Sequence, residues 1–283
     1  MTLSPRSLSG LAPLLPAVLV LSYFVVALLI FSLRALWRGV PHDREIESRG
    51  QSVLVSFYFR NYFIWVTRPL WGLLLASGIS ANTVTALAAA LGAFSGVAVA
   101  AGRFALGGWL FLFAGILDAM DGRLARARGQ VAPSGGIVDS VLDRYTDSIL
   151  LIGLCWYFRT SWVLLPTLMA LLGTSLVPYV RAKAEAMGIT LHGGLMQRPE
   201  RVLYLGTALA VTPIVELVLS PGDPHPFPRL AALGVIFLAV TTNLTAIKRF
   251  LDLLRAVSPR RSIVPRARSA ARRRHGRLRP GHP

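Results

Sequence analysis

Residues 117–147 read LDAMDGRLARARGQVAPSGGIVDSVLDRYTD and place five aspartates inside or beside segments that are apolar enough to cross a bilayer. Residues that are three, four, seven or eight positions apart share one face of an α-helix. One such stripe holds Asp118, Asp121, Gly122, Ala125 and Arg126. A second stripe, at intervals of four residues, holds Gly135, Asp139, Asp143 and Asp147. Carboxylates therefore share each face with residues that have little or no side chain.

A helix break separates the two stripes. Gly129 can end the first helix, and Pro133 with Ser134 can start the second. We therefore expect two antiparallel neighbouring helices whose acidic stripes face each other near the cytoplasmic side of a membrane. A charge inside a span costs roughly 2.5 to 3.5 kcal/mol on insertion scales, so these carboxylates need partners.

Two kinds of partner can neutralise the carboxylates. Mg2+ and Mn2+ prefer oxygen ligands, and four carboxylates are enough to hold two such ions. The alternative is pairing with the arginines that lie close in the sequence, which are Arg123, Arg126, Arg128 and Arg144. Salt bridges need no small residues on the acidic face, whereas Gly122, Ala125 and Gly135 leave room for a ligand. The pattern favours a metal site with a bound ligand.

The composition predicts a polytopic membrane protein. Of the 283 residues, 54% are hydrophobic and 15% are charged, which is too apolar for an ordinary soluble domain. Apolar runs of about 20 residues are typical of transmembrane helices. Such runs occur at residues 11–33, 81–101, 105–127, 134–158, 161–185, 199–220 and 229–250. Residues 57–76, rich in aromatics and interrupted at Pro69, predict an in-plane interfacial helix.

The distribution of Lys and Arg predicts the orientation. Twenty-five of the thirty fall on one side of the predicted spans, which makes that side cytoplasmic and puts the N-terminus outside. The predicted organisation has four parts. They are a transmembrane anchor at 1–36, a cytoplasmic linker with the interfacial helix at 37–80, a six-span core at 81–256 and a basic, disordered cytoplasmic tail at 257–283.

Composition also argues against several other functions. The net charge of +17 is concentrated in the tail, which has no aromatic residues to stack on bases, so we expect contact with anionic lipid and no nucleic acid. Cys155 is the single cysteine, which leaves no disulfide framework or thiolate metal site. The five histidines show no ligand spacing. A cation transporter would need acidic residues toward both membrane faces, and here they gather toward one.

The motif Asp118-x-x-Asp121-Gly122-x-x-Ala125-Arg126, eight residues, Gly135-x-x-x-Asp139-x-x-x-Asp143 resembles the signature of the CDP-alcohol phosphatidyltransferase family at every fixed position. The likeness extends over about residues 55–255. It implies an all-α integral membrane protein with the six-helix core of that family, an interfacial helix and one extra N-terminal transmembrane helix. The implied reaction transfers the phosphatidyl group from CDP-diacylglycerol to an acceptor alcohol and releases CMP, as a step of phospholipid biosynthesis.

The resemblance also implies roles for individual residues. Two Mg2+ or Mn2+ ions would be held by Asp118, Asp121, Asp139 and Asp143, and Asp143 would be the general base. The CDP-lipid would be bound by Asp121, Gly122, Ala125, Arg126 and Gly135. Asp147 lies outside the signature, so a supporting role is favoured over direct ligation. We expect a bacterial inner (cytoplasmic) membrane with the active site facing the cytoplasm, and the family suggests a homodimer.

Residues 175–202, SLVPYVRAKAEAMGITLHGGLMQRPERV, carry two cations at each end of one predicted cytoplasmic loop. These cations can form a pocket for a phosphorylated acceptor; they are Arg181, Lys183, Arg198 and Arg201. The segment resembles the phosphatidylinositol phosphate synthase subgroup, whose acceptor is myo-inositol phosphate, although Lys183 stands where we expect arginine. Glycerol 3-phosphate and free inositol are alternative acceptors. A divalent-cation transporter and a lipid-binding scaffold are the alternatives of a different class.

Overall fold

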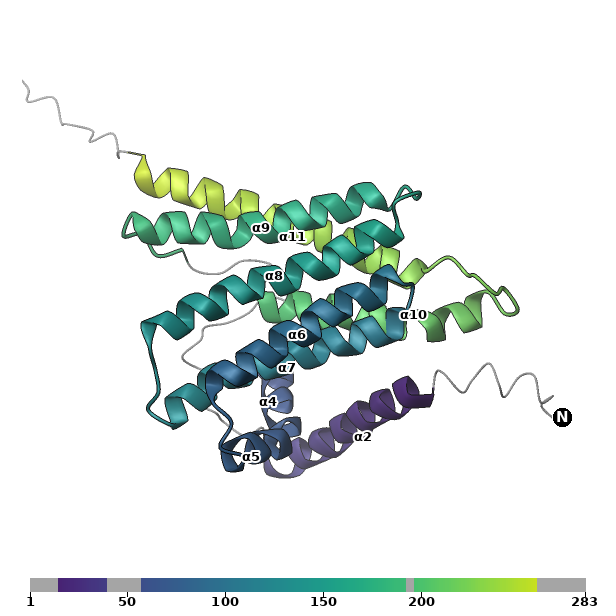
Figure 1. Cartoon of the computed structure of the whole chain (residues 1–283), viewed down its shortest axis with the longest axis horizontal. Coiled ribbons are helices and arrows are strands. Elements are labelled where there is room, and N and C mark those ends of the chain that lie inside the picture. Colours follow the sequence, from purple (N-terminus) through teal and green to yellow (C-terminus); the bar gives the residue numbers. More distant parts are fainter. Residues whose placement is uncertain (1–14, 40–56, 192–195, 259–283) are drawn as a thin grey trace, which may run out of the picture.

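The computed structural model describes residues 15–39, 57–191 and 196–258 (Figure 1). Within these ranges the chain consists of helices joined by turns and contains no strand, which confirms the predicted all-α class. The helices are α2 (Leu15–Arg38), α4 (Phe57–Val66), α5 (Arg68–Ala76), α6 (Ala81–Ala100), α7 (Phe104–Ala127), α8 (Pro133–Tyr157), α9 (Leu164–Ala186), α10 (Arg198–Leu219) and α11 (Arg229–Val257). The start of the predicted anchor, most of the linker and nearly all of the tail lie outside the described residues.

The helices α6 to α11 close into a ring. Going around it, α6 packs against α7, α7 against α10, α10 against α11, α11 against α9, α9 against α8, and α8 again against α6. Figure 1 shows α6, α7 and α8 running side by side, with α9 beside α11. Buried apolar side chains from around the ring fill its interior, among them Val99, Phe111, Leu154, Leu209 and Val235. Because the interior is apolar, charged groups within the ring must be satisfied by partners within it.

The predicted helix break is confirmed. α7 ends at Ala127, Gly129 has a φ of +65°, and α8 begins with Pro133. L side chains rarely adopt a positive φ, so glycine favours the end of a helix here. Proline suits the first position of a helix because its missing N–H would have no partner there.

The two acidic stripes meet as predicted, because carboxylate oxygens of Asp118, Asp121 and Asp139 all lie within 4.8 Å of one another. The prediction that α7 and α8 are neighbours in close contact is wrong. α7 and α8 each make their extensive contact with α6 (Figure 1). The cause is glycine on α6 and α8, because a Cβ on Gly153 would lie 2.2 Å from the carbonyl oxygen of Gly96. A Cβ on Gly92 would lie equally close to the methyl group of Thr146. α6 therefore fits closely against α8, and its side chains reach the acidic stripes of both neighbours.

Several helices have the length and composition of membrane spans. Among the described residues, those long and apolar enough are α6, α7, α9, α10 and α11. α8, which was predicted as the span 134–158, is 25 residues long but carries Asp139, Asp143, Arg144 and Asp147. The chain is an integral membrane protein, and α8, which carries part of the acidic site, is not among these five helices.

α2 lies outside the ring and is held by α4. Phe31 of α2 is fully buried and packs against the rings of Tyr58, Tyr62 and Trp65. The hydroxyl of Tyr62 donates a hydrogen bond of 2.6 Å to the backbone carbonyl of Phe24. α4 and α5 together cover the segment predicted as an interfacial helix, and they are divided at Thr67, beside the predicted interruption.

The close approach of α6 and α8 generates a stability prediction. Gly153→Ala should destabilise the protein by roughly 1 to 3 kcal/mol, because the added methyl group meets backbone that cannot move aside. Gly136→Ala on the same helix is the matched control, since a Cβ there would meet no atom within 4 Å. Thermal unfolding of the purified protein in detergent measures both. Equal melting temperatures for the two variants would contradict this account of the packing.

Candidate active site

Three aspartates form a compact acidic group at one end of the ring. Asp118 and Asp121 of α7 and Asp139 of α8 each offer a carboxylate oxygen, and these oxygens all lie within 4.8 Å of one another. We call them the acidic triad. Within the described parts of the chain, neither Asp121 nor Asp139 forms an ion pair with an arginine or lysine. A divalent cation is the partner that suits three such oxygen donors.

α6 contributes a residue that orients the acidic triad. The hydroxyl of Thr85 donates a hydrogen bond of 2.6 Å to Oδ2 of Asp121, and the backbone N–H of Gly122 donates to Oδ1 of the same carboxylate. Both oxygens of Asp121 are thus held, and the residue is only 5% exposed. Thr85 was not predicted because the aspartate stripes lie on α7 and α8, whereas Thr85 lies on α6. The signal that could have found it is a polar side chain one turn inside an otherwise apolar span.

Arg198 of α10 lies among the other carboxylates. Its Nη1 contacts Asp118, its Nη2 lies 2.9 Å from Oδ1 of Asp143, and its Nε lies 3.6 Å from Oδ1 of Asp147. The sequence predicted Arg198 for an acceptor phosphate and Asp143 for the metals. Here the two side chains pair with each other, and Asp143 lies outside the acidic triad.

The arginines nearest in sequence to the stripes have other contacts. Arg128 donates to the backbone carbonyls at the end of α5 and to that of Ile79, and Arg144 donates to the carbonyl of Ser140. The guanidinium of Arg123 lies 5.1 Å from the ring centre of Trp71. Among the described residues, the ion pairs with the acidic stripes come from Arg198 and Arg201 of α10, and Arg198 is 80 residues away from Asp118 in the sequence.

The small residues of the predicted signature leave open surface. A Cβ on Gly122 would meet only Nη1 of Arg126, at 3.5 Å, and a Cβ on Gly135 would meet only Oδ1 of Asn82, at 3.9 Å. These are ordinary contact distances, unlike the 2.2 Å at Gly153. Helix packing therefore does not explain Gly122 or Gly135. Gly122, Gly135 and the half-buried Ala125 thus leave room beside their helices for a ligand to approach.

A group of arginines lies beside the acidic residues. Nη2 of Arg201 pairs with Oδ2 of Asp147 at 3.0 Å, and its Nη1 donates to the carbonyl of Thr174. Arg249 of α11 donates to the carbonyl of Val177 and is repelled by the charges of Arg181 and Arg201. Arg181, Arg201 and Arg249 thus come from three helices and are near enough for Arg249 to be affected by the other two charges. Arg181 also pairs with Glu185 on its own helix, at 2.8 Å.

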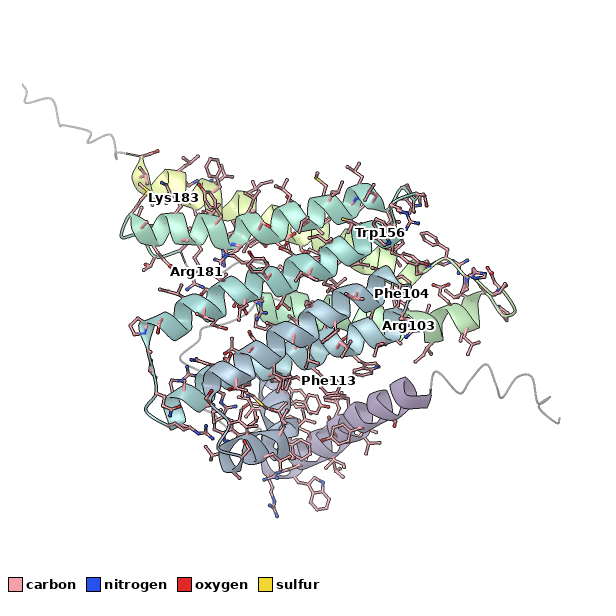
Figure 2. The ribbon with its side chains drawn as sticks, in the orientation of Figure 1. Arg103, Phe104, Phe113, Trp156, Arg181 and Lys183 are labelled. Atoms are coloured by element: carbon pink, nitrogen blue, oxygen red, sulfur yellow. The ribbon has the colours of Figure 1, made fainter. Side chains whose placement is uncertain are left out.

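Lys183 lies apart from this group. Residues two positions apart on a helix are about 200° apart around its axis. Figure 2 accordingly shows Arg181 and Lys183 on opposite sides of α9. Arg249 was not predicted as a site residue because it was interpreted only as part of the cytoplasmic positive charge. It lies on α11, so helical spacing within residues 181–201 gives no indication of its position.

With this geometry described, comparison with known proteins identifies the family. Residues 78–247 match the family model for CDP-alcohol phosphatidyltransferase. The chain belongs to this family. Thr85 and all the site residues predicted from the sequence fall inside the matched region, whereas Arg249 lies two positions beyond it. The resemblance predicted from the signature is confirmed, as is the enzyme class.

Individual relatives agree with this assignment. The chain is 31% identical over 198 residues to the phosphatidylinositol phosphate synthase of Mycobacteroides abscessus, covering 67% of this chain and 84% of that protein. It resembles the crystal structure of Mycobacterium tuberculosis phosphatidylinositol phosphate synthase with CDP-DAG bound, with a TM-score of 0.57 and 27% identity over 67% of this chain and 94% of that one. The same enzyme in complex with manganese and citrate gives a TM-score of 0.56 at 27% identity, over 66% of this chain and 88% of that one.

The hydrogen bond from Thr85 to Asp121 generates a prediction about metal affinity. Thr85→Val should weaken Mn2+ binding on the order of tenfold or more, because the carboxylate loses the donor that orients it. Thr85→Ser keeps a hydroxyl and should bind Mn2+ like the unaltered protein. Electron paramagnetic resonance of free Mn2+ during a titration measures the dissociation constants. Wild-type affinity in Thr85→Val would show that the bond does not support the site.

Proposed function

We propose that this enzyme transfers the phosphatidyl group of CDP-diacylglycerol to myo-inositol phosphate and releases CMP. The observation that most supports this proposal is that the acidic residues and the arginines form a continuous set of contacts. Asp147 pairs with Arg201 at 3.0 Å and lies 3.6 Å from Arg198, which in turn contacts Asp118 of the acidic triad. A site for metal ions and a site for an anion therefore adjoin, as transfer between a diphosphate and a phosphorylated alcohol requires.

The donor set of the acidic triad fits Mg2+ or Mn2+. The triad offers only carboxylate oxygens, and two of its members have no cationic partner in the described structure. We propose that Asp118, Asp121 and Asp139, together with Asp143, hold two such ions. When bound, the ions would neutralise charge on the diphosphate and favour departure of CMP.

The remaining residues bind the CDP-lipid and move the acceptor proton. The open surface at Gly122, Ala125 and Gly135 would receive the nucleotide, and Arg126 would contact the diphosphate. Asp143 would accept the proton of the acceptor hydroxyl, because a carboxylate that lies beside the site can act as a general base. The lipid tails would stay in the bilayer while the polar groups meet at the end of the ring.

The cationic group would bind the acceptor through its phosphate. Arg201 is 7% exposed as a residue, and its Nε is buried without a hydrogen-bond partner, so it can donate to an anion. We propose that Arg181, Arg198, Arg201 and Arg249 form this pocket. Arg249 would take the place that the sequence prediction assigned to Lys183. Several guanidinium groups favour a phosphorylated acceptor over free inositol.

We further propose that the enzyme lies in the inner (cytoplasmic) membrane of a bacterium with its active site facing the cytoplasm and its N-terminus outside. Arg181 and Lys183 lie at the end of the ring opposite to Arg103 and Trp156 (Figure 2). That end carries the greater share of the Lys and Arg near the spans, as expected for a cytoplasmic side. The predicted homodimer stays a prediction.

The reaction is tested by release of CMP. Purified protein with Mn2+, CDP-diacylglycerol and myo-inositol phosphate should release CMP faster than with glycerol 3-phosphate or inositol, because its arginines suit a phosphate and its relatives are phosphatidylinositol phosphate synthases. Asp121→Asn and Asp139→Asn should each lower kcat on the order of 100-fold or more, the size typical of lost charge stabilisation. An unchanged rate in both variants would count against the metal assignment.

The acceptor pocket is tested by comparing two cations near the same end of the ring. Arg249→Gln should raise the KM for the phosphorylated acceptor by about tenfold, because one charge-assisted hydrogen bond is lost. The KM for CDP-diacylglycerol should stay the same. Lys183→Gln removes the same charge from the opposite face of α9 and should change neither constant. The reverse result, with Lys183→Gln affecting the acceptor and Arg249→Gln not, would restore the prediction made from the sequence.

A further inference from the structure

Arg198 occupies the space between the acidic helices. It contacts Asp118 and Asp143 through Nη1 and Nη2, and only 19% of its side chain is exposed. The cavity beside it, which Thr85 and Asp118 also line, has a volume of about 10 Å³. That is room for about one water molecule. Any larger group that enters this space requires the guanidinium to move.

The guanidinium is also incompletely satisfied where it lies. Its Nε and Oδ1 of Asp147 are both buried without a hydrogen-bond partner, and they are 3.6 Å apart. A buried donor or acceptor without a partner is destabilising, and these two could satisfy each other after a small shift. A second arrangement is therefore available to Arg198, in which its Nε donates a hydrogen bond to Oδ1 of Asp147.

Asp118 is the residue for which two cations compete. It belongs to the acidic triad and is at the same time the partner of Arg198. A divalent ion on the triad would repel the guanidinium and draw on the negative charge of the same carboxylate, so each of the two contacts weakens the other. Displaced from Asp118 and Asp143, Arg198 would still have Asp147 on its other side, where Arg201 is already bound.

We propose that Arg198 competes with the metal ions for Asp118 and Asp143, and that an anion in the neighbouring arginine pocket draws it away from them. This proposal rests on the proposed function for the location of the two sites. It follows that a divalent metal and a tetrahedral dianion bind with positive coupling. Each raises the affinity of the other by the same factor, because coupling between two binding equilibria is reciprocal.

The coupling is tested on the full chain by measuring Mn2+ affinity with and without sulfate. Sulfate is a tetrahedral dianion that leaves Mn2+ soluble, and sodium chloride at equal ionic strength serves as the reference. Free Mn2+ is measured by electron paramagnetic resonance in detergent solution. In the unaltered protein, sulfate should lower the Mn2+ dissociation constant by about fivefold or more. No change, or weaker binding of Mn2+, would overturn the proposal without the need for any variant.

Substitutions at Arg198 identify the side chain responsible. Arg198→Gln should bind Mn2+ more tightly than the unaltered protein and should lose the effect of sulfate. Arg198→Lys keeps the charge but cannot bridge two carboxylates. Its Mn2+ affinity should therefore lie between that of the unaltered protein and that of Arg198→Gln. Lys183→Gln is the control for a nearby lost charge and should keep both the affinity and the sulfate effect. Circular dichroism verifies the helix content of each variant. Mn2+ affinity in Arg198→Gln equal to that of the unaltered protein would contradict the competition.

The failure of this proposal can be told from failure of the proposed function. If sulfate tightens Mn2+ binding but no acceptor supports CMP release, the competition between Arg198 and the metal ions stands and the proposed reaction is wrong. If CMP is released but sulfate has no effect on Mn2+ binding, the proposed reaction stands and the proposed competition is wrong.

Discussion

Neutralising several carboxylates at the end of an apolar ring is the constraint on which the rest of this structure depends. Charges within a membrane protein need internal partners, because hydrocarbon offers none. Thr85 and the backbone of Gly122 satisfy Asp121, and Arg198 satisfies Asp118 and Asp143. These contacts come from three helices besides α8, so the ring must be closed before the acidic residues are stable. The site and the fold therefore stabilise each other.

Two kinds of glycine make this arrangement possible. Gly96 and Gly153 remove side chains so that α6 and α8 can touch backbone to backbone, which places α6 against both acidic helices. A Cβ on Gly122 or Gly135 would make only ordinary contacts with a side chain, so close helix packing does not require these two glycines. The first kind shapes the helix bundle and the second shapes the surface that a ligand meets. Sequence alone does not separate them, since both kinds occur at helical spacing beside apolar residues.

Much of the site could be predicted from the sequence, because it lies in two helices that follow each other in the chain. Periodicity placed the aspartates on shared faces, and Gly129 with Pro133 set the limits of α7 and α8 correctly. The missed features all depend on contacts between distant parts of the chain: α6 against both acidic helices, Thr85 on Asp121, and Arg249 near Arg201. Helical spacing reports which residues share a face. It does not report which helix that face will meet.

Asp147 shows why residues outside a signature can be essential to its geometry. It continues the spacing of four residues from Asp139 and Asp143, yet it contacts arginines and not the acidic triad. Its position one turn beyond Asp143 allows one carboxylate to hold Arg201 and to lie within reach of Arg198. A residue that is 8% exposed and bound to a cation on one side cannot easily rotate away. Asp147 therefore sets the distance between the carboxylates that suit metal ions and the arginines that suit a phosphate.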